Sequence, residues 1–202
     1  MMDYEHSGLL SHQVLVLLLL EVQWRPVFLA PTDTSCDLRS TKSLTELVRH
    51  EANELLDKYT TFHGPINGLV DGVPDSTISG INISEKLQDI VNKNILFYLH
   101  ISKVEEYQKA HWGNPESVAK PLTDVKTRLD HHLSKIQAIL KHIIPEMPLP
   151  ATPAPPQLSN DHDYRRKKYG WGVIDKLKDW LTKVLQVLEE AKEVCDKETA
   201  EI

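Results

Sequence analysis

The sequence predicts an all-α protein: a long-chain four-helix bundle with up-up-down-down helix order and two long crossover loops. Its 202 residues include only 8 glycines and 6% aromatic residues, a composition that favours helices over the short strands of a sandwich or barrel. Four segments carry apolar residues at the three-and-four spacing that places them on one face of a helix. Between these segments lie two long links and one short link. A chain of this length is expected to form one domain.

The four apolar stripes define the four expected helices. They predict helices over about 43–60, 84–109, 116–144 and 164–198. Either Asn82 or Ser84 can cap the second helix, because both side chains accept hydrogen bonds from the free amides of a first turn. The third helix is expected to be entered through Pro115 or Pro121, and Asp163 is the expected cap of the fourth.

The links predict how the helices run. Residues 60–81 hold four glycines and two prolines, and residues 145–156 hold six of the chain's 12 prolines. An extended segment gains about 3 Å per residue, so either link can pass along helices that are about 37 Å long. A link of that kind joins parallel helices, whereas the short link between the second and third helices makes them antiparallel. The expected order is therefore up-up-down-down.

The first 30 residues are predicted to be a cleaved signal peptide. Val14 to Leu20 is an unbroken apolar run, and the small residue Ala30 follows at the expected cleavage site. The run is too short to span a membrane, which takes about 20 apolar residues. Residues 31–202 are expected to form the helical domain, secreted to the extracellular space without membrane insertion.

The chain contains two cysteines, Cys36 and Cys195, an even number that permits one disulfide in an oxidising compartment. In the expected helix order the first helix begins, and the fourth helix ends, at the same pole, which brings the two cysteines together. The sequence therefore predicts a disulfide between Cys36 and Cys195, with two free thiols as the alternative. Asn82-Ile83-Ser84 is the one acceptor pattern for N-glycosylation, so Asn82 is the expected glycosylation site.

Composition and motifs give no support to catalysis or metal binding. The formal net charge of -6 does not demand nucleic acid or an anionic membrane as a partner. His50 opens a pattern close to a zinc-protease helix, but Glu54 stands where the second imidazole is needed. His131 and His132 point about 100° apart on a helix and are interpreted as surface residues. The prediction is a protein without catalytic residues, metal or cofactor, and not an enzyme.

A run of four cations, Arg165 to Lys168, lies at the amino end of the fourth helix, where the helix dipole favours anions. Gly170 and Gly172 follow and weaken the first turns. Departures of this kind from local preference often mark function. The alternatives are a solvated charge cluster, a nuclear address or a patch for nucleic acid or heparin, although the acidic balance of the remaining chain opposes binding of a polyanion.

The segment from Asp163 to Trp180 resembles the start of the fourth helix in the leukaemia inhibitory factor and ciliary neurotrophic factor branch of the interleukin-6 cytokines. In that branch the helix opens with an aromatic residue, two further residues and a lysine, and Tyr164 and Lys167 occupy these positions. Tyr164 stands where the family usually has phenylalanine. The segment Asp71-Gly72-Val73-Pro74, in the first long link, is similar to a ciliary-type stretch.

The resemblance implies a secreted cytokine that acts by bridging cell-surface receptors. Tyr164 and Lys167 would contact a leukaemia inhibitory factor receptor-like ectodomain, and a face of the first and third helices would contact the shared signal-transducing subunit, a glycoprotein 130-like receptor. An aromatic ring that fills a pocket, beside a cation that fixes its register, concentrates binding energy at an interface. The chain is expected to be a monomer that activates JAK/STAT signalling. The alternatives are an intracellular helical adaptor and an amphipathic lipid-binding bundle.

Overall fold

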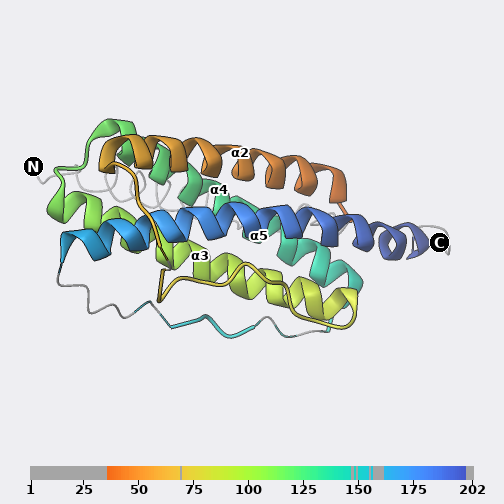
Figure 1. Ribbon diagram of the computed structural model, residues 1–202. Coiled ribbons are helices and arrows are strands. Elements are labelled where there is room, and N and C mark those ends of the chain that lie inside the picture. The colour runs from red at the N-terminus through yellow and green to blue at the C-terminus, as the bar shows by residue number, and fades with distance from the viewer. Residues whose placement is uncertain are drawn as a thin grey trace, which may run out of the picture. The chain divides into compact units, whose positions relative to one another are not determined.

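The computed structural model of the chain describes residues 36–68, 70–146, 148, 150–154, 156 and 162–198. The predicted signal peptide lies outside these residues. Within them the chain forms four α-helices and no strand, which confirms the all-α prediction. The helices are α2 (Leu38–His63), α3 (Ile83–His111), α4 (Glu116–Ile143) and α5 (Asp163–Glu198). Figure 1 shows them lying side by side along a common axis.

The four helices pack as a bundle around one core. α2 and α3 each contact both α4 and α5. The apolar stripes face inward, and the side chains of Tyr59, Phe97 and Trp180 are fully buried. The rings of Phe97 and Trp180 lie 5.1 Å apart between centroids and join α3 to α5. None of the described helices is both long and apolar enough to cross a membrane.

α2 begins at Leu38, earlier than the start predicted near residue 43. The Asp37 carboxylate accepts a hydrogen bond of 3.1 Å from a first-turn amide and caps the helix. Thr41 and Thr45 are buried. The Thr41 hydroxyl donates a hydrogen bond to the carbonyl one turn back, and the Thr45 hydroxyl lies 2.8 Å from the Thr41 carbonyl. Two core-facing threonines therefore interrupt the apolar stripe, and a rule based on apolar spacing misses the first turn.

The structure resolves the alternatives at the other helix ends. Asn82 caps α3, because its Oδ1 accepts a hydrogen bond of 2.9 Å from a first-turn amide. α4 begins after Pro115, and Pro121 lies inside the helix. Asp163 is the first residue of α5, so its prediction as the cap was wrong: the carbonyl of the residue before it already accepts a helical hydrogen bond of 3.2 Å.

A buried lysine holds the link between α2 and α3, residues 64–82, against α3. The Lys93 side chain is 10% exposed, and its ammonium contacts Asp75 at 2.9 Å and Asp89 at 3.6 Å. The same ammonium donates hydrogen bonds to the carbonyl and hydroxyl of Thr77. Asp89 also accepts a hydrogen bond of 3.0 Å from a link amide. In Figure 1 this part of the link follows α3 as a yellow segment.

Candidate functional site

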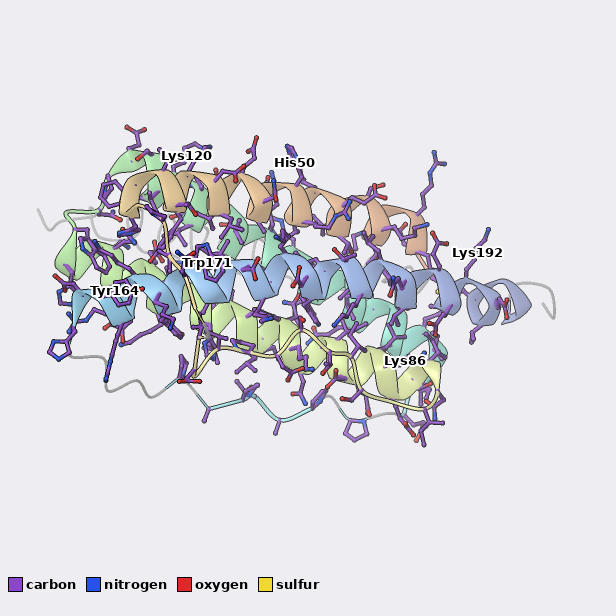
Figure 2. The ribbon with its side chains drawn as sticks, viewed as in Figure 1. His50, Lys86, Lys120, Tyr164, Trp171 and Lys192 are labelled. Atoms are coloured by element: carbon purple, nitrogen blue, oxygen red, sulfur yellow. A yellow bond between two sulfur atoms is a disulfide. The ribbon has the colours of Figure 1, made fainter. Side chains whose placement is uncertain are left out.

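Tyr164 is an exposed aromatic side chain in the first turn of α5. Its exposed fraction is 57%, compared with 40% for Phe62. Figure 2 labels it at the amino-terminal end of α5. Tyrosine combines a large apolar ring with a polar hydroxyl, which is why it is enriched at protein interfaces. The position and exposure of Tyr164 make it available for contact with a partner.

Lys167 follows Tyr164 by three residues, so the two side chains lie on the same side of α5. Lys167 is half-buried, and its backbone carbonyl accepts a hydrogen bond of 3.3 Å from the hydroxyl of Tyr59 in α2. Burial, and then the positive charge of Lys167, lower the pKa of His63, the last residue of α2, to about 4. The two residues singled out in the sequence therefore share one face of α5, beside the end of α2.

An aromatic cluster at this end of the bundle was missed by the sequence analysis. His63 packs against the rings of Tyr59, Phe62 and Trp112, with centroid separations of 4.3, 4.7 and 4.7 Å. Trp112 belongs to the short link between α3 and α4 and is half-buried. The signal in the sequence is that Phe62 and Trp112 stand two residues and one residue before the glycines that follow α2 and α3. The cluster adds apolar surface next to Lys167.

Two cations of the four-cation run, Arg166 and Lys168, contact different parts of the bundle. Arg166 pairs with Asp163 at 2.9 Å, and its guanidinium lies 5.8 Å from the centre of the Tyr107 ring of α3. Lys168 lies against the link between α2 and α3, where its Nζ is 3.3 Å from the position that a Cβ on Gly68 would take. Arg166 and Lys168 therefore pack against different elements of the bundle.

Gly170 and Gly172 allow close packing on α5. A Cβ on Gly170 would lie 2.2 Å from the hydroxyl oxygen of Tyr59, and a Cβ on Gly172 would lie 2.7 Å from the side chain of Val70. Val70 belongs to the link between α2 and α3, which passes over α5 in Figure 1. The two glycines therefore have a structural reason for their place in the first turns, although they weaken the helix.

The structure separates the two adjacent histidines of α4. His131 is exposed, but His132 is fully buried, so its interpretation as a surface residue was wrong. The cause is helical periodicity, since position 132 shares the core-facing side with Leu129 and Ile136. His50 lies on an exposed face, 3.6 Å from the Glu54 carboxylate. Across the described part of the chain, no three side chains of the types that bind metals are grouped closely enough to hold an ion.

Cys36 and Cys195 lie at disulfide distance, with Cα atoms 5.9 Å apart and a sequence separation of 159. They join the start of α2 to the end of α5. A groove of about 690 Å³ opens beside them. Its lining mixes cations with carboxylates, including the ion pair of Lys42 and Glu189, and so presents no single kind of ligand chemistry.

The expected glycosylation residue, Asn82, is exposed. Its Oδ1 caps α3, and its Nδ2 donates a hydrogen bond of 3.0 Å to the Glu85 carboxylate. A sugar is attached through Nδ2 and leaves Oδ1 in place. Capping of the helix and glycosylation of Asn82 are therefore compatible.

No family model and no curated protein matches this chain. Its class is defined by fold and surface: a four-helix bundle with an exposed aromatic residue and a lysine in the first turns of its last helix. Assignment of the chain to a narrower class of protein depends on Tyr164 and Lys167, at the amino-terminal end of α5.

Proposed function

We propose that this chain is a secreted helical cytokine of the leukaemia inhibitory factor and ciliary neurotrophic factor branch, which bridges two cell-surface receptors and thereby activates JAK/STAT signalling. The observation that carries the proposal is the exposed ring of Tyr164 one turn before Lys167, on the first turns of α5. This is the aromatic-and-lysine pair that the resemblance assigns to the leukaemia inhibitory factor receptor. The protein acts by holding two receptors together and performs no catalysis.

The proposed contact uses the two side chains in different ways. The Tyr164 ring enters an apolar pocket of the receptor, where its hydroxyl needs a polar partner. The Lys167 ammonium pairs with a receptor carboxylate and fixes the register of the ring. The hydrogen bond from Tyr59 to the Lys167 carbonyl holds this turn of α5 before binding, which lowers the ordering cost of the complex. The 40% exposed ring of Phe62 offers apolar surface near the pair.

The proposal includes up-up-down-down order with two long crossover links. Ion pairs between helices support it. Asp37, at the start of α2, pairs with Lys135 in the carboxy-terminal half of α4 at 2.8 Å. Lys86, in the first turn of α3, pairs with Glu190 in the carboxy-terminal half of α5 at 2.5 Å. Such contacts are expected when α2 and α3 run one way and α4 and α5 run the other.

Secretion is part of the proposal and has its own support. Cysteines at disulfide distance are typical of oxidising compartments, and Asn82 is exposed for glycosylation. An intracellular adaptor would instead keep Cys36 and Cys195 reduced and carry no sugar on Asn82. The lipid-binding alternative requires apolar stripes that open onto a membrane, whereas the stripes of all four helices are buried against one another.

The test is binding of the purified mature chain to an immobilised leukaemia inhibitory factor receptor ectodomain. Tyr164→Ala and Lys167→Ala are each expected to weaken binding by more than about 2 kcal/mol, because both side chains lie at the centre of the contact. Two control variants remove similar groups elsewhere. Ile81→Ala deletes an apolar side chain that is 95% exposed, and Lys192→Ala deletes an exposed cation near the far end of α5.

Both controls are expected to bind like the wild type, and circular dichroism of all five proteins should show the same helicity. Failure of the wild-type chain to bind any receptor of this family would remove the proposed function. If Tyr164→Ala and Lys167→Ala bind the receptor as tightly as the wild type does, the chain is still a receptor-binding cytokine, but Tyr164 and Lys167 are not its receptor contact.

A further inference from the structure

His132 contacts every helix of the bundle through polar or aromatic groups. It belongs to α4 and has no exposed surface. Its Nε2 lies 3.0 Å from the hydroxyl of Thr45 in α2, and its Nδ1 lies 2.6 Å from Oδ1 of Asn94 in α3. The ring of Trp180 in α5 meets it edge to face, with 6.1 Å between ring centroids. A single imidazole therefore lies where the packing of all four helices converges.

The proton on Nδ1 is fixed by Asn94. The amide nitrogen of Asn94 donates a hydrogen bond of 2.8 Å to the carbonyl of Leu129, which sets the orientation of the amide group. Its oxygen is then directed at His132 and can only accept a hydrogen bond. His132 must donate from Nδ1, and in the neutral imidazole Nε2 is then an acceptor.

The hydroxyl of Thr45 can serve both protonation states of His132. It lies 2.8 Å from the carbonyl of Thr41 and 3.0 Å from Nε2 of His132. Beside the neutral imidazole, the hydroxyl proton points at Nε2. If Nε2 takes a proton from solvent, the hydroxyl accepts a hydrogen bond from it and turns its own proton to the Thr41 carbonyl. Neither state leaves a ring nitrogen without a partner.

We propose that His132, Thr45 and Asn94 form a proton-operated switch in the core. Rotation of the Thr45 hydroxyl lets His132 take up a second proton in acid. The buried positive charge that results then weakens the packing of all four helices. The proposal does not depend on the receptor assignment.

The electrostatics of the site set the direction of the response. α2 presents Thr45, α3 presents Asn94, α4 presents the carbonyl of Leu129 and α5 presents the ring of Trp180, and none of these groups carries a charge. Burial alone lowers the pKa of His132 from 6.5 to about 4. The folded chain thus holds a neutral imidazole at pH 7, and unfolding takes up a proton between about pH 4 and pH 6.5. Stability contributed by this group is complete above pH 6.5 and falls as the pH falls towards 4.

The first test measures proton uptake on unfolding of the full mature chain, from the slope of the unfolding free energy against pH between 4.5 and 6.5. His132→Leu is expected to reduce that uptake by up to one proton per molecule. The adjacent and exposed His131→Leu is the matched control and is expected to leave the uptake unchanged. Equal uptake in wild type and a folded His132→Leu variant would overturn the proposal.

The second test observes the switch in the wild-type chain and needs no deletion of the histidine. Nitrogen-15 NMR is expected to show the proton of neutral His132 on Nδ1 and a second proton on Nε2 in acid. Thr45→Val keeps the shape but removes the hydroxyl, so it is expected to move the titration of His132 to lower pH, while Thr45→Ser leaves the titration in place. A neutral form protonated on Nε2, or a Thr45→Val titration identical to the wild type, contradicts the mechanism.

Discussion

The hydroxyl of Tyr59 in α2 donates a hydrogen bond of 3.3 Å to the backbone carbonyl of Lys167 in α5. Tyr59 is fully buried, so the hydrogen bond connects the core directly to the turn that carries the candidate receptor contact. The approach is possible because Gly170 has no side chain at the point where the tyrosine hydroxyl reaches α5. The position of Lys167 on the surface of α5 therefore depends on Tyr59, a core residue of another helix.

Gly170→Ala tests this arrangement. Alanine favours a helix over glycine by about 1 kcal/mol, but its Cβ would lie 2.2 Å from the Tyr59 hydroxyl oxygen. Overpacking of this kind typically costs about 1–3 kcal/mol, so we expect a net loss in the free energy of unfolding, measured by denaturant titration. Lys192→Ala, at an exposed site of the same helix, should stay close to the wild type. A Gly170→Ala protein as stable as the wild type would mean that Tyr59 does not hold α5 in this way.

The cysteine pair provides a prediction about stability. A disulfide between Cys36 and Cys195 closes a loop with a sequence separation of 159, and constraint of the unfolded chain gives it a ceiling of about 5 kcal/mol. We expect the denaturation midpoint to fall on addition of reductant, and to fall equally in the Cys36→Ser and Cys195→Ser double variant without reductant. Thiol titration of the denatured, unreduced chain should find none. Two reactive thiols would show that the bridge does not form.

The sequence allowed the helices to be predicted because each buried face repeats at the helical period, as in the stripe that ends at Cys195 in α5. The first turn of α2 was not predicted, since the core positions there are Thr41 and Thr45 and their hydrogen bonds cannot be read from apolar spacing. His132 was misinterpreted because it is polar, although its position shares the core-facing side of α4 with Leu129 and Ile136. The hydrogen bonds to Thr45 and Asn94, which allow the imidazole to be buried, come from two other helices. Contacts between helices distant in sequence are invisible to a pattern read along one of them.

The candidate site shows the same limit. Tyr164 and Lys167 could be singled out because they are close in sequence and fit a known pattern. Phe62 and Trp112 come from two other elements and meet only around His63. No spacing rule connects the end of one helix with the link between two others, so this part of the surface required the three-dimensional structure.

Two substitutions separate the capping role of Asn82 from its expected glycosylation. Ser84→Ala removes the acceptor pattern and keeps the cap, while Asn82→Ala removes both. In secreting cells both variants should lose the glycan and run at lower apparent mass. In unglycosylated protein from bacteria, only Asn82→Ala should lose stability, by about 1 kcal/mol, because only the cap is then missing. If the secreted wild-type chain carries no sugar, Asn82 is not a glycosylation site.

The link between α2 and α3 is expected to loosen in strong acid. Hydrogen bonds from Thr77 and Lys93 lower the pKa of Asp75 from 3.8 to about 2. Because the folded pKa is lowered, this contribution to stability is complete above pH 3.8 and is lost as the pH falls towards 2. The Asp75 side chain is 66% exposed, so solvent screening keeps the contribution below about 1 kcal/mol.

Amide exchange can detect this small effect locally. The Thr77 amide donates a hydrogen bond of 2.9 Å to the Asp75 carboxylate, and Asp75→Ala should speed its exchange at neutral pH. Asp71→Ala removes an exposed carboxylate from the same link and serves as the control. Equal exchange of the Thr77 amide in all three proteins would show that Asp75 does not hold the link.

One molecule of this chain is proposed to join two different receptors. Light scattering after size-exclusion chromatography tests it directly, with the leukaemia inhibitory factor receptor ectodomain, the shared signal-transducing ectodomain and the chain mixed in equal amounts. We expect one complex that contains all three proteins. In the Tyr164→Ala and Lys167→Ala double variant, we expect the leukaemia inhibitory factor receptor to elute alone while the shared subunit is still bound. If the wild-type chain never brings the two ectodomains into one complex, the account of this protein as a bridging cytokine is contradicted.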